Sequence, residues 1–304
     1  MREAFSDALV QLANEDDRVL LLTGDHGYAL FDQFRTLHPD RFINAGIAEQ
    51  NMVGMAAGLA RMGFRPFVYG LSAFVPVRVL EQIKIDVAHD DLPVVFIGDG
   101  AGFVYSYLGT SHQSLEDIAC CRAIPGLTIL SPADRHELKA SMRRAHDLGG
   151  PVYLRMGKSD RGDVHQGPLV AGLEQLHLLK PGKPGGTAVL ATGSMVWTAL
   201  RVADALTDLA VWSVPQLKPF SGAGLVPIYE AATQIVTIEE HSMMGGLGAL
   251  IAEESSTLNP LRILRIGVED RFSEHAGSYE YLLHEHGLDV TRVTERIQAF
   301  VGNG

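Results

Sequence analysis

Cysteine is nearly absent from this sequence: only Cys120 and Cys121 occur among its 304 residues, and they are neighbours in an apolar-flanked segment. A disulfide framework or a structural zinc site needs thiols spread along the chain, so the sequence indicates neither. We therefore expect two buried, reduced thiols.

An excess of positive charge is also absent. The 25 Lys and Arg residues against 36 Asp and Glu residues give a net charge of -11, and no Lys/Arg run compensates for it. The chain thus lacks the electrostatic footprint of a nucleic-acid-binding protein. Apolar runs long enough to cross a bilayer are missing, and the amphipathic, partly acidic start of the chain is unlike a secretory signal. We expect a cytoplasmic protein whose partners are neither nucleic acid nor membrane.

Short apolar runs alternate along the chain with helix-like segments whose apolar residues recur every three or four positions. This alternation is typical of a parallel sheet covered by helices on both faces. The expected strands are residues 19–22, 42–45, 66–69, 94–97, 127–130, 152–154, 188–191, 211–214, 235–238 and 262–266. Helices are expected near residues 48–62, 197–206, 246–254 and 278–286.

The predicted fold class is α/β, with two consecutive domains that have mainly parallel sheets flanked by helices. The first domain covers residues 1–160 and the second covers residues 187–304. Between them, residues 161–186 contain Gly, Pro and His and interrupt the alternation, so we interpret them as a linker.

Residues 41–58 contain the most informative junction of the chain. A short strand meets a bend at Gly46, and a helix of small apolar residues follows, so that Glu49 stands where strand becomes helix beside buried surface. On its own, Glu49 is explained as an acid that complements the positive end of the helix dipole. A role in chemistry needs support from other parts of the sequence.

Four ordered motifs provide that support. They are Gly-Ile-Ala-Glu-Gln-Asn (46–51) with Arg-Pro-Phe-Val (65–68), Thr-Ser-His-Gln (110–113), Arg-Ala-Ile-Pro-Gly-Leu (122–127) and Ser-Pro-Ala-Asp (131–134). Together they resemble the pyrimidine-binding domain of thiamine-diphosphate enzymes of the transketolase type. Residues 237–248 resemble the carboxy-terminal domain signature of the same family. The chain is most similar to the carboxy-terminal, pyrimidine-binding subunit of split transketolases.

The resemblance implies a thiamine-diphosphate-dependent transferase that moves a two-carbon ketol unit between sugar or modified-sugar substrates. It also implies a separate amino-terminal, diphosphate-binding subunit in an α2β2 assembly, with Mg²⁺ bound mainly by that partner and no metal ligand in this chain. Two enzymatic alternatives stay open: a 2-oxoacid dehydrogenase E1 beta-like subunit and a 1-deoxyxylulose-phosphate-synthase-like carboligase subunit. A further alternative is a non-catalytic relative that keeps the fold.

The resemblance gives five residues a cofactor-binding role. Glu49 matches the carboxyl that hydrogen-bonds the cofactor's aminopyrimidine and promotes formation of the reactive ylide, because a carboxyl can share a proton with a ring nitrogen. Phe74 matches an aromatic ring that stacks on the aminopyrimidine, with ordinary core packing as the alternative. The other three residues are Asp25, Ile47 and Arg78, the last of which is expected to fix the ring edge.

Substrate contacts are expected from three further residues. His112 matches a histidine that faces the reacting carbons, and we assign it both catalysis and substrate binding. It precedes Ser114, which we interpret as the start of a helix cap. Lys158 lies near the place of a family arginine and keeps a positive charge for an anionic group. His26 has no counterpart in the family motif and is kept as a substrate-binding candidate.

Several patterns depart from the family or fail as sites. Leu108 replaces an aspartate that reads the donor's hydroxyl, and Gly98 and Ala29 replace phosphate-reading residues, so the substrate pocket is expected to be altered. Gly-Asp-Gly at residues 98–100 resembles the start of a magnesium site, but none of the five asparagines is adjacent to another. We interpret the glycines of residues 245–248 as helix packing and His284-Glu-His286 as solvated surface.

Overall fold

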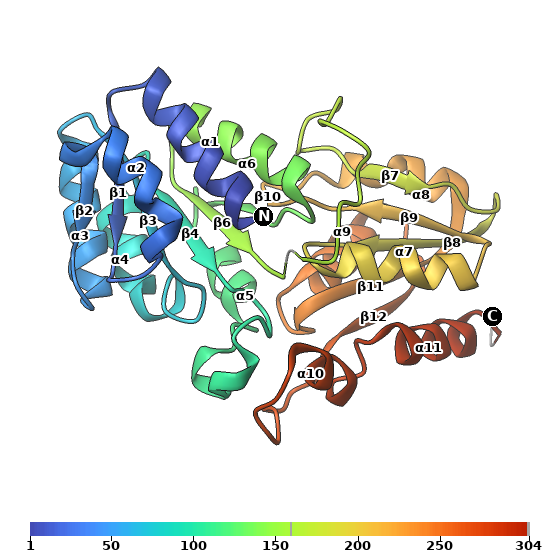
Figure 1. Ribbon diagram of the computed structural model, residues 1–304. Helices are drawn as coiled ribbons and strands as arrows, with labels where there is room; N and C mark the ends of the chain where they lie inside the picture. The colour runs from blue at the N-terminus through green and yellow to red at the C-terminus, as the bar shows by residue number, and fades with distance from the viewer. Residues whose placement is uncertain (159, 303–304) are drawn as a thin grey trace.

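The computed structural model describes residues 1–158 and 160–302, which form two sheets flanked by helices (Figure 1). The first sheet has seven strands in the order β10 (Gln216–Lys218), β5 (Thr128–Leu130), β6 (Val152–Met156), β4 (Val95–Asp99), β3 (Arg65–Leu71), β1 (Val19–Thr23) and β2 (Phe42–Asn44). The second has the order β12 (Arg262–Val268), β11 (Ala232–Ser242), β8 (Gly186–Ala191), β9 (Leu209–Ser213) and β7 (His177–Lys180). Both sheets are mainly parallel, as the sequence predicts.

Helices cover both faces of the first sheet, since its strands β1, β4 and β6 are buried along their full length. On one face α1 (Arg2–Glu15) packs beside α6 (Arg135–Asp147), with α2 (Asp32–Leu37) next to them. On the other face lie α3 (Glu49–Arg61), α4 (Leu80–Gln82), η4 (Ile83–Ala88) and α5 (Asp117–Arg122). The short turns η5 (Ser106–Leu108) and η6 (Thr110–His112) precede α5.

The second sheet is covered by α7 (Met195–Ala205), α10 (Tyr279–Glu285) and α11 (Val290–Gly302) on one face. On its other face lie α8 (Val226–Ala231) and α9 (Leu247–Leu258). This second face does not form a separate core. Val68 and Phe96 of the first sheet belong to the same apolar cluster as Ile235 on β11 and Ile251 on α9. One of the three hydrophobic clusters therefore spans both sheets.

Two strands depart from the sequence interpretation. β7 forms inside residues 161–186, for which the sequence predicts a linker, and it pairs antiparallel with β9. β10 comes from the second half of the chain but pairs antiparallel with β5 at the edge of the first sheet, with Gln216 opposite Leu130. The chain thus returns from the second sheet to complete the first, and each sheet has one antiparallel edge strand.

Local signals explain where helices begin. Asp134 caps α6 by accepting hydrogen bonds from the backbone N–H groups of His136 and Glu137, both at 2.9 Å. Ser278 caps α10 in the same way through Tyr281. α3 has no side-chain cap, and its first residue is the acidic Glu49, which suits the positive end of the helix dipole.

Candidate active site

The carboxyl ends of β1, β2 and β3 meet at one edge of the first sheet, and the loops that follow them carry the predicted cofactor residues. Glu49, the first residue of α3, is only 5% exposed. Arg78 donates a 3.0 Å hydrogen bond to Oε1 of this carboxylate. The buried acid predicted from the sequence therefore has a charged partner, which is itself about half exposed.

Arg78 connects Glu49 with the aromatic residue predicted to stack on the cofactor. Its guanidinium carbon lies 4.1 Å from the ring centroid of Phe74, a cation–π contact. The ring of His112 meets Phe74 edge-to-face, with centroids 5.2 Å apart and planes at 68°. Four residues from three separate segments thus form one chain of contacts: Glu49, Arg78, Phe74 and His112.

The side chain of Asn44 connects the two loops that carry Asp25 and Gly46. Oδ1 of Asn44 accepts hydrogen bonds from the backbone N–H groups of Asp25 and Gly46, and the Asn44 amide donates to the Asp25 carboxylate at 3.0 Å. Asp25 has a φ of 63°, a left-handed conformation that this Asn contact stabilises. Gly46 has a φ of 70° and open space where a Cβ would stand, so its backbone can be approached closely.

His26 and Ile47 occupy the same pair of loops and differ in exposure, since His26 is half-buried and Ile47 is exposed. Nδ1 of His26 is buried and has no hydrogen-bond partner among the described residues. Ile47 is 78% exposed, so its side chain contacts little of this chain. A buried, unpartnered ring nitrogen and an exposed apolar side chain next to Glu49 are both compatible with a ligand or a partner chain at this edge.

Lys158 lies in a different part of the molecule from the Glu49–His112 contacts. Its ammonium group pairs with Asp160 at 3.1 Å and lies 5.2 Å from the ring centroid of Tyr279. It lines a pocket of about 200 Å³ together with Arg2 and Asp99. Among the described residues, the charged neighbours of Lys158 are thus Asp160, Arg2 and Asp99. None of the other candidate site residues lines this pocket.

The aspartate of the Gly-Asp-Gly motif, Asp99, is paired with other side chains of the same chain. The Asp99 carboxylate is nearly buried and accepts hydrogen bonds from Arg2 at 2.6 Å and from the Tyr105 hydroxyl at 2.8 Å. Among the described residues, no group of three or more His, Cys, Asp or Glu side chains has the arrangement of a metal site. Asp99 therefore acts as an internal ion-pair partner at the end of β4.

The glycines of residues 245–248 surround an internal carboxylate. Glu239 on β11 accepts hydrogen bonds from the backbone N–H groups of Leu247 and Gly248 at the start of α9. A Cβ at Gly246 would lie 1.9 Å from the Glu239 carboxylate, so only glycine fits. Burial raises the pKa of Glu239 to about 7, although the two N–H groups oppose this change.

Two sequence interpretations are wrong in detail. The sequence predicts solvated surface for His286, but this residue is only 5% exposed, stacks on Phe103 at 5.0 Å, and its Nε2 lies 2.9 Å from the Ser273 hydroxyl. The reason is that α10 packs against the loops after β4, a long-range contact. Ser114 is predicted to cap α5, but its hydroxyl is buried at 2.7 Å from the hydroxyl of Ser72. Of the two thiols, Cys121 is buried and Cys120 is half-buried.

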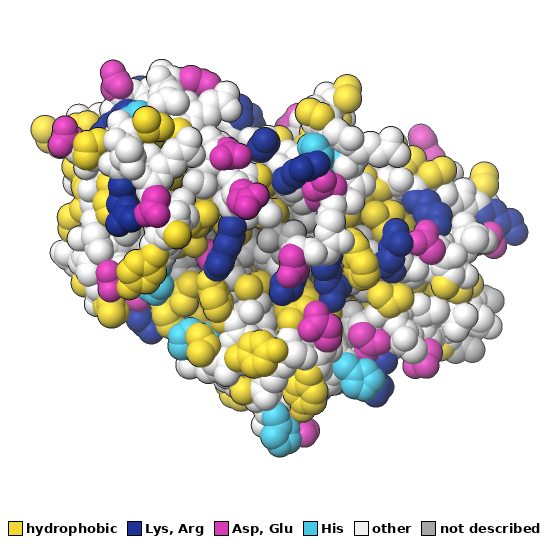
Figure 2. All heavy atoms as spheres, viewed as in Figure 1, with side chains coloured by type: hydrophobic (Ala, Val, Ile, Leu, Met, Phe, Trp, Pro, Cys, Tyr) yellow, Lys and Arg dark blue, Asp and Glu magenta, His cyan; other side chains and the backbone are white. Residues whose placement is uncertain are grey.

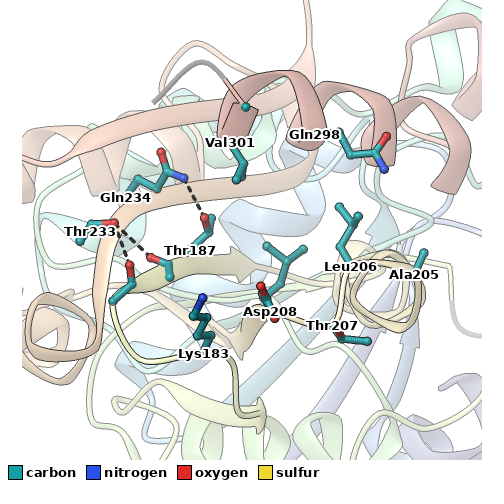
Figure 3. Close-up of a pocket in the computed structure, with 14 residues that line it drawn as sticks. Lys183, Thr187, Ala205, Leu206, Thr207, Asp208, Thr233, Gln234, Gln298 and Val301 are labelled. Atoms are coloured by element: carbon teal, nitrogen blue, oxygen red, sulfur yellow. Dashed lines mark hydrogen bonds between the residues drawn. The ribbon is translucent and has the colours of Figure 1, made fainter.

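A large pocket lies far from these residues. It measures about 640 Å³ and is lined by residues near the amino ends of β8, β9 and β11, including Thr187, Asp208 and Gln234 (Figure 3). In contrast, the face shown in Figure 2 carries a gathering of hydrophobic side chains where the two domains meet. The exposed large hydrophobic residues of the first domain include Tyr28, Ile47, Tyr107 and Leu108, which lie in loops and short 3-10 turns. At the candidate site, Arg78 and Ile47 are exposed, whereas Glu49 is buried.

Comparison with known families identifies the fold. Residues 1–162 match the transketolase pyrimidine binding domain, and residues 183–293 match the transketolase C-terminal domain. The chain belongs to the transketolase family. Dependence on thiamine diphosphate is a property of this family, and the chain is thus a transketolase-like transferase subunit.

Relatives of matching length carry the names of transketolase subunits. The chain is 33% identical to one subunit of the apulose-4-phosphate transketolase of Phocaeicola vulgatus, covering 99% of this chain and 97% of the relative. It is 34% identical to the 6-deoxy-6-sulfo-D-fructose transketolase subunit SqwH of a Clostridium species, covering 96% and 92%. A solved split-gene transketolase, described as an inactive beta4 tetramer, superposes with a TM-score of 0.87 at 32% identity, covering 98% of this chain and 96% of that one.

Sequence reasoning missed two features of this transketolase-type site. Asn44 ties the loops of Asp25 and Gly46, and an asparagine two residues before a glycine bend was a usable signal for such a tie. The buried Ser72–Ser114 contact joins segments 42 residues apart, and no local pattern encodes it. Within the described residues, no helix has both the length and the apolarity needed to cross a membrane.

Proposed function

We propose that this chain is the pyrimidine-binding half of a two-component transketolase that transfers a two-carbon ketol unit between sugar-type substrates. The observation that supports this most is the chain of contacts from buried Glu49 through Arg78 and Phe74 to His112. These residues combine an acid, an aromatic ring and an imidazole in one set of contacts. A non-catalytic relative would have no need to keep that combination.

The residues present fit the aminopyrimidine of thiamine diphosphate. When bound, this cofactor supplies a nucleophilic thiazolium carbon that attacks a carbonyl group. Glu49 is the carboxylate that would share a proton with a ring nitrogen, and Phe74 offers a half-buried ring for stacking. Asp25, Ile47 and the open backbone at Gly46 would complete the cradle. His112 would hold and move a proton on the substrate side.

The diphosphate and Mg²⁺ would be held mainly by a partner subunit. Asp99 of the Gly-Asp-Gly motif is already paired with Arg2 and Tyr105, and no paired asparagines follow it in the sequence. The exposed hydrophobic side chains on the first-domain loops offer apolar area for such a partner. We propose an α2β2 assembly in the cytoplasm, with each cofactor bound between two chains.

A modified sugar is the proposed substrate. Leu108 stands where the family carries a donor-reading aspartate, and its side chain is 56% exposed in η5, two residues before η6, which ends at His112. An apolar side chain favours a substrate that lacks a hydroxyl, or carries a substituent, at that position. Relatives named for apulose 4-phosphate and 6-deoxy-6-sulfofructose are consistent with variable substrates. Lys158 would contact an anionic group on the sugar, and His26, in the loop that follows β1, is proposed as a separate substrate contact.

Reconstitution tests this proposal. The chain is mixed with the α/β protein from the same genome that carries Gly-Asp-Gly and a downstream asparagine pair, roughly 250 to 300 residues long. Thiamine diphosphate, Mg²⁺ and ketose donors, including 6-deoxy-6-sulfofructose and apulose 4-phosphate, are added with an aldose phosphate. We expect ketol transfer only with both chains, and no tight cofactor binding by either alone. Carbon dioxide release from pyruvate without ketol transfer would favour the two alternative enzyme classes.

A further inference from the structure

Two buried serines join the segments that carry Phe74 and His112. Ser72 precedes Phe74 by two residues, and Ser114 follows His112 by two. Both side chains are fully buried, and their hydroxyl oxygens lie 2.7 Å apart. The edge-to-face contact of the two rings therefore rests on a hydrogen bond between the segments that carry them.

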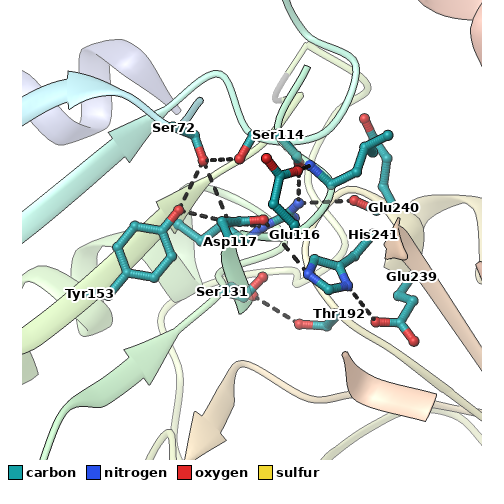
Figure 4. Close-up of polar contacts among 12 residues, drawn as sticks. Ser72, Ser114, Glu116, Asp117, Ser131, Tyr153, Thr192, Glu239, Glu240 and His241 are labelled. Atoms are coloured by element: carbon teal, nitrogen blue, oxygen red, sulfur yellow. Dashed lines mark hydrogen bonds and ion pairs between the residues drawn. The ribbon is translucent and has the colours of Figure 1, made fainter. Parts of the chain in front are cut away.

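The hydrogen bonds below this pair have one direction. Asp117 accepts at Oδ2 from the Tyr153 hydroxyl at 2.7 Å, so the single proton of Tyr153 is used there (Figure 4). The Ser72 hydroxyl lies 2.9 Å from the Tyr153 oxygen and 3.4 Å from Asp117 Oδ2, so its single proton is directed toward these two acceptors. Ser114 must then donate to Ser72. The acceptor-only carboxylate thus orients the whole series, and each bond polarises the next.

Asp117 is in turn fixed as an anion between the two domains. Burial is the largest single influence and opposes ionisation, but Arg155, His241 and the Tyr153 hydrogen bond together hold the pKa of the Asp117 carboxyl below its ordinary value. Nε of Arg155 donates to Asp117 at 2.7 Å, and Nη2 donates to the backbone carbonyls of Ser114 and Glu240. The orienting carboxylate is therefore held by Arg155 of β6, whose guanidinium also contacts β11 of the second domain.

We infer that Asp117 is a positioning residue that, through Tyr153 and the Ser72–Ser114 pair, sets the placement of the His112 ring against Phe74. This inference rests on the proposed function, because it gives His112 its importance for turnover. Asp117 does not touch substrate or cofactor in this role. Its effect on the reaction passes entirely through His112.

Epistasis with His112 tests the inference in the reconstituted complex. Ser114→Ala and Tyr153→Phe each interrupt the series while leaving the Asp117–Arg155 pair in place. We expect either substitution to lower kcat about tenfold in the wild-type background and less than about twofold when His112 is already alanine. Ser141→Ala is the matched control, since Ser141 is fully buried and its hydroxyl has no partner in the described part of the chain. Equal losses of kcat in the two backgrounds would overturn the inference.

A second readout does not require turnover. In the free chain, the ring-proton resonances of His112, assigned by their loss in His112→Ala, report its distance from the Phe74 ring. We expect them to shift in Ser114→Ala and Tyr153→Phe and to stay in place in Ser141→Ala, with thermal stability checked for all three. Unmoved resonances in a folded Tyr153→Phe chain would also overturn the inference. Absence of ketol transfer in the wild-type complex would instead refute the proposed function. The resonance experiment uses the free chain, so its outcome does not depend on that function.

Discussion

At the scale of single residues, Glu49 has Arg78 as a partner in the structure and would gain the cofactor's aminopyrimidine as a second partner. One oxygen of the Glu49 carboxylate faces the Arg78 guanidinium at 3.0 Å, and that guanidinium covers a face of Phe74. A bound aminopyrimidine would share Glu49 with Arg78. Glu49 is the residue most important to the proposed chemistry, and glutamine can replace it without a large change in packing.

Glu49→Gln in the reconstituted complex should separate binding from chemistry. Glutamine keeps the size and a hydrogen bond to the ring nitrogen but cannot share a proton as a carboxyl does. We expect thiamine diphosphate affinity to stay within about tenfold, or roughly 1.4 kcal/mol, and turnover to fall by at least about 10². Calorimetry and steady-state rates provide the measurement, with exchange of the thiazolium proton slowing in parallel.

Glu81→Gln is the matched control for this experiment. Glu81 is an exposed acid on α4, three residues beyond Arg78. Its neutralisation should leave both affinity and turnover unchanged. Near-normal proton exchange and turnover in Glu49→Gln would return Glu49 to a purely structural role at the start of α3.

Lys158→Ala should act on substrate binding alone. The Lys158 ammonium is about a quarter exposed and pairs with Asp160, so it is held near its pocket but can exchange partners with an anionic substrate. We expect the KM for a phosphorylated or sulfonated substrate to rise about tenfold with little change in kcat. Lys139→Ala, on the exposed side of α6, is the control. An unchanged KM together with slowed thiazolium proton exchange would contradict this assignment.

At the scale of elements, the sequence predicted the strands that have strong apolar runs and missed those that depend on distant partners. The ten expected strands are present, and so is the helix that begins at Glu49. β10 was missed because three residues, Gln216–Lys218, carry no periodic signal, and their partner Leu130 lies far away in sequence. The contacts among Glu49, Arg78, Phe74 and His112 required the resemblance, because spacing along the chain does not give distances between loops.

The contact between β11 and α5 carries a pH-sensitive histidine. His241 is fully buried, donates from Nδ1 to the Ser242 carbonyl and accepts at Nε2 from the Ala119 N–H, as a neutral imidazole does. Asp117 lies 4.0 Å and Glu239 3.7 Å from its ring nitrogens. Burial nevertheless lowers the pKa of His241 to about 4.

Acid should therefore weaken this domain contact. Because the folded-state pKa of His241 is below its ordinary value of 6.5, its contribution to stability is complete above about pH 6.5 and is lost as pH falls toward 4. The loss is on the order of 3 kcal/mol. Urea unfolding at pH 7.5, 5.5 and 4 should show this loss in the wild type and a smaller one in His241→Gln.

The contribution of Glu239 to stability changes with pH in the opposite direction, so the experiment has to separate it from the contribution of His241. Its pKa is raised to about 7 from 4.5, so its contribution to stability decreases as pH rises through that interval. Wild type and His241→Gln both contain Glu239, so the difference between them isolates the histidine. Parallel pH curves for the two proteins would show that His241 is not the group that responds.

At the scale of the whole molecule, a hydrophobic cluster shared by both sheets should give one unfolding transition. The apolar cluster that contains Phe96 also contains Ile251, and both side chains are fully buried. We expect scanning calorimetry to show a single transition with equal calorimetric and van't Hoff enthalpies. Ile251→Ala should lower the midpoint of that transition without splitting it, at a cost of about 2–5 kcal/mol. Two resolved transitions would mean that the two sheets unfold independently.

The return of β10 to the first sheet bears on how members of this family can recombine. A hybrid joined within residues 161–186 would take β5 from one parent and β10 from the other. It would have to reproduce the pairing of Gln216 with Leu130 and the hydrogen bond from the Lys218 ammonium to the Arg122 carbonyl. Hybrids should therefore fold when residues 216–218 come from the same parent as the amino-terminal domain. The boundary between the two sequence domains is not the boundary at which the molecule can be cut.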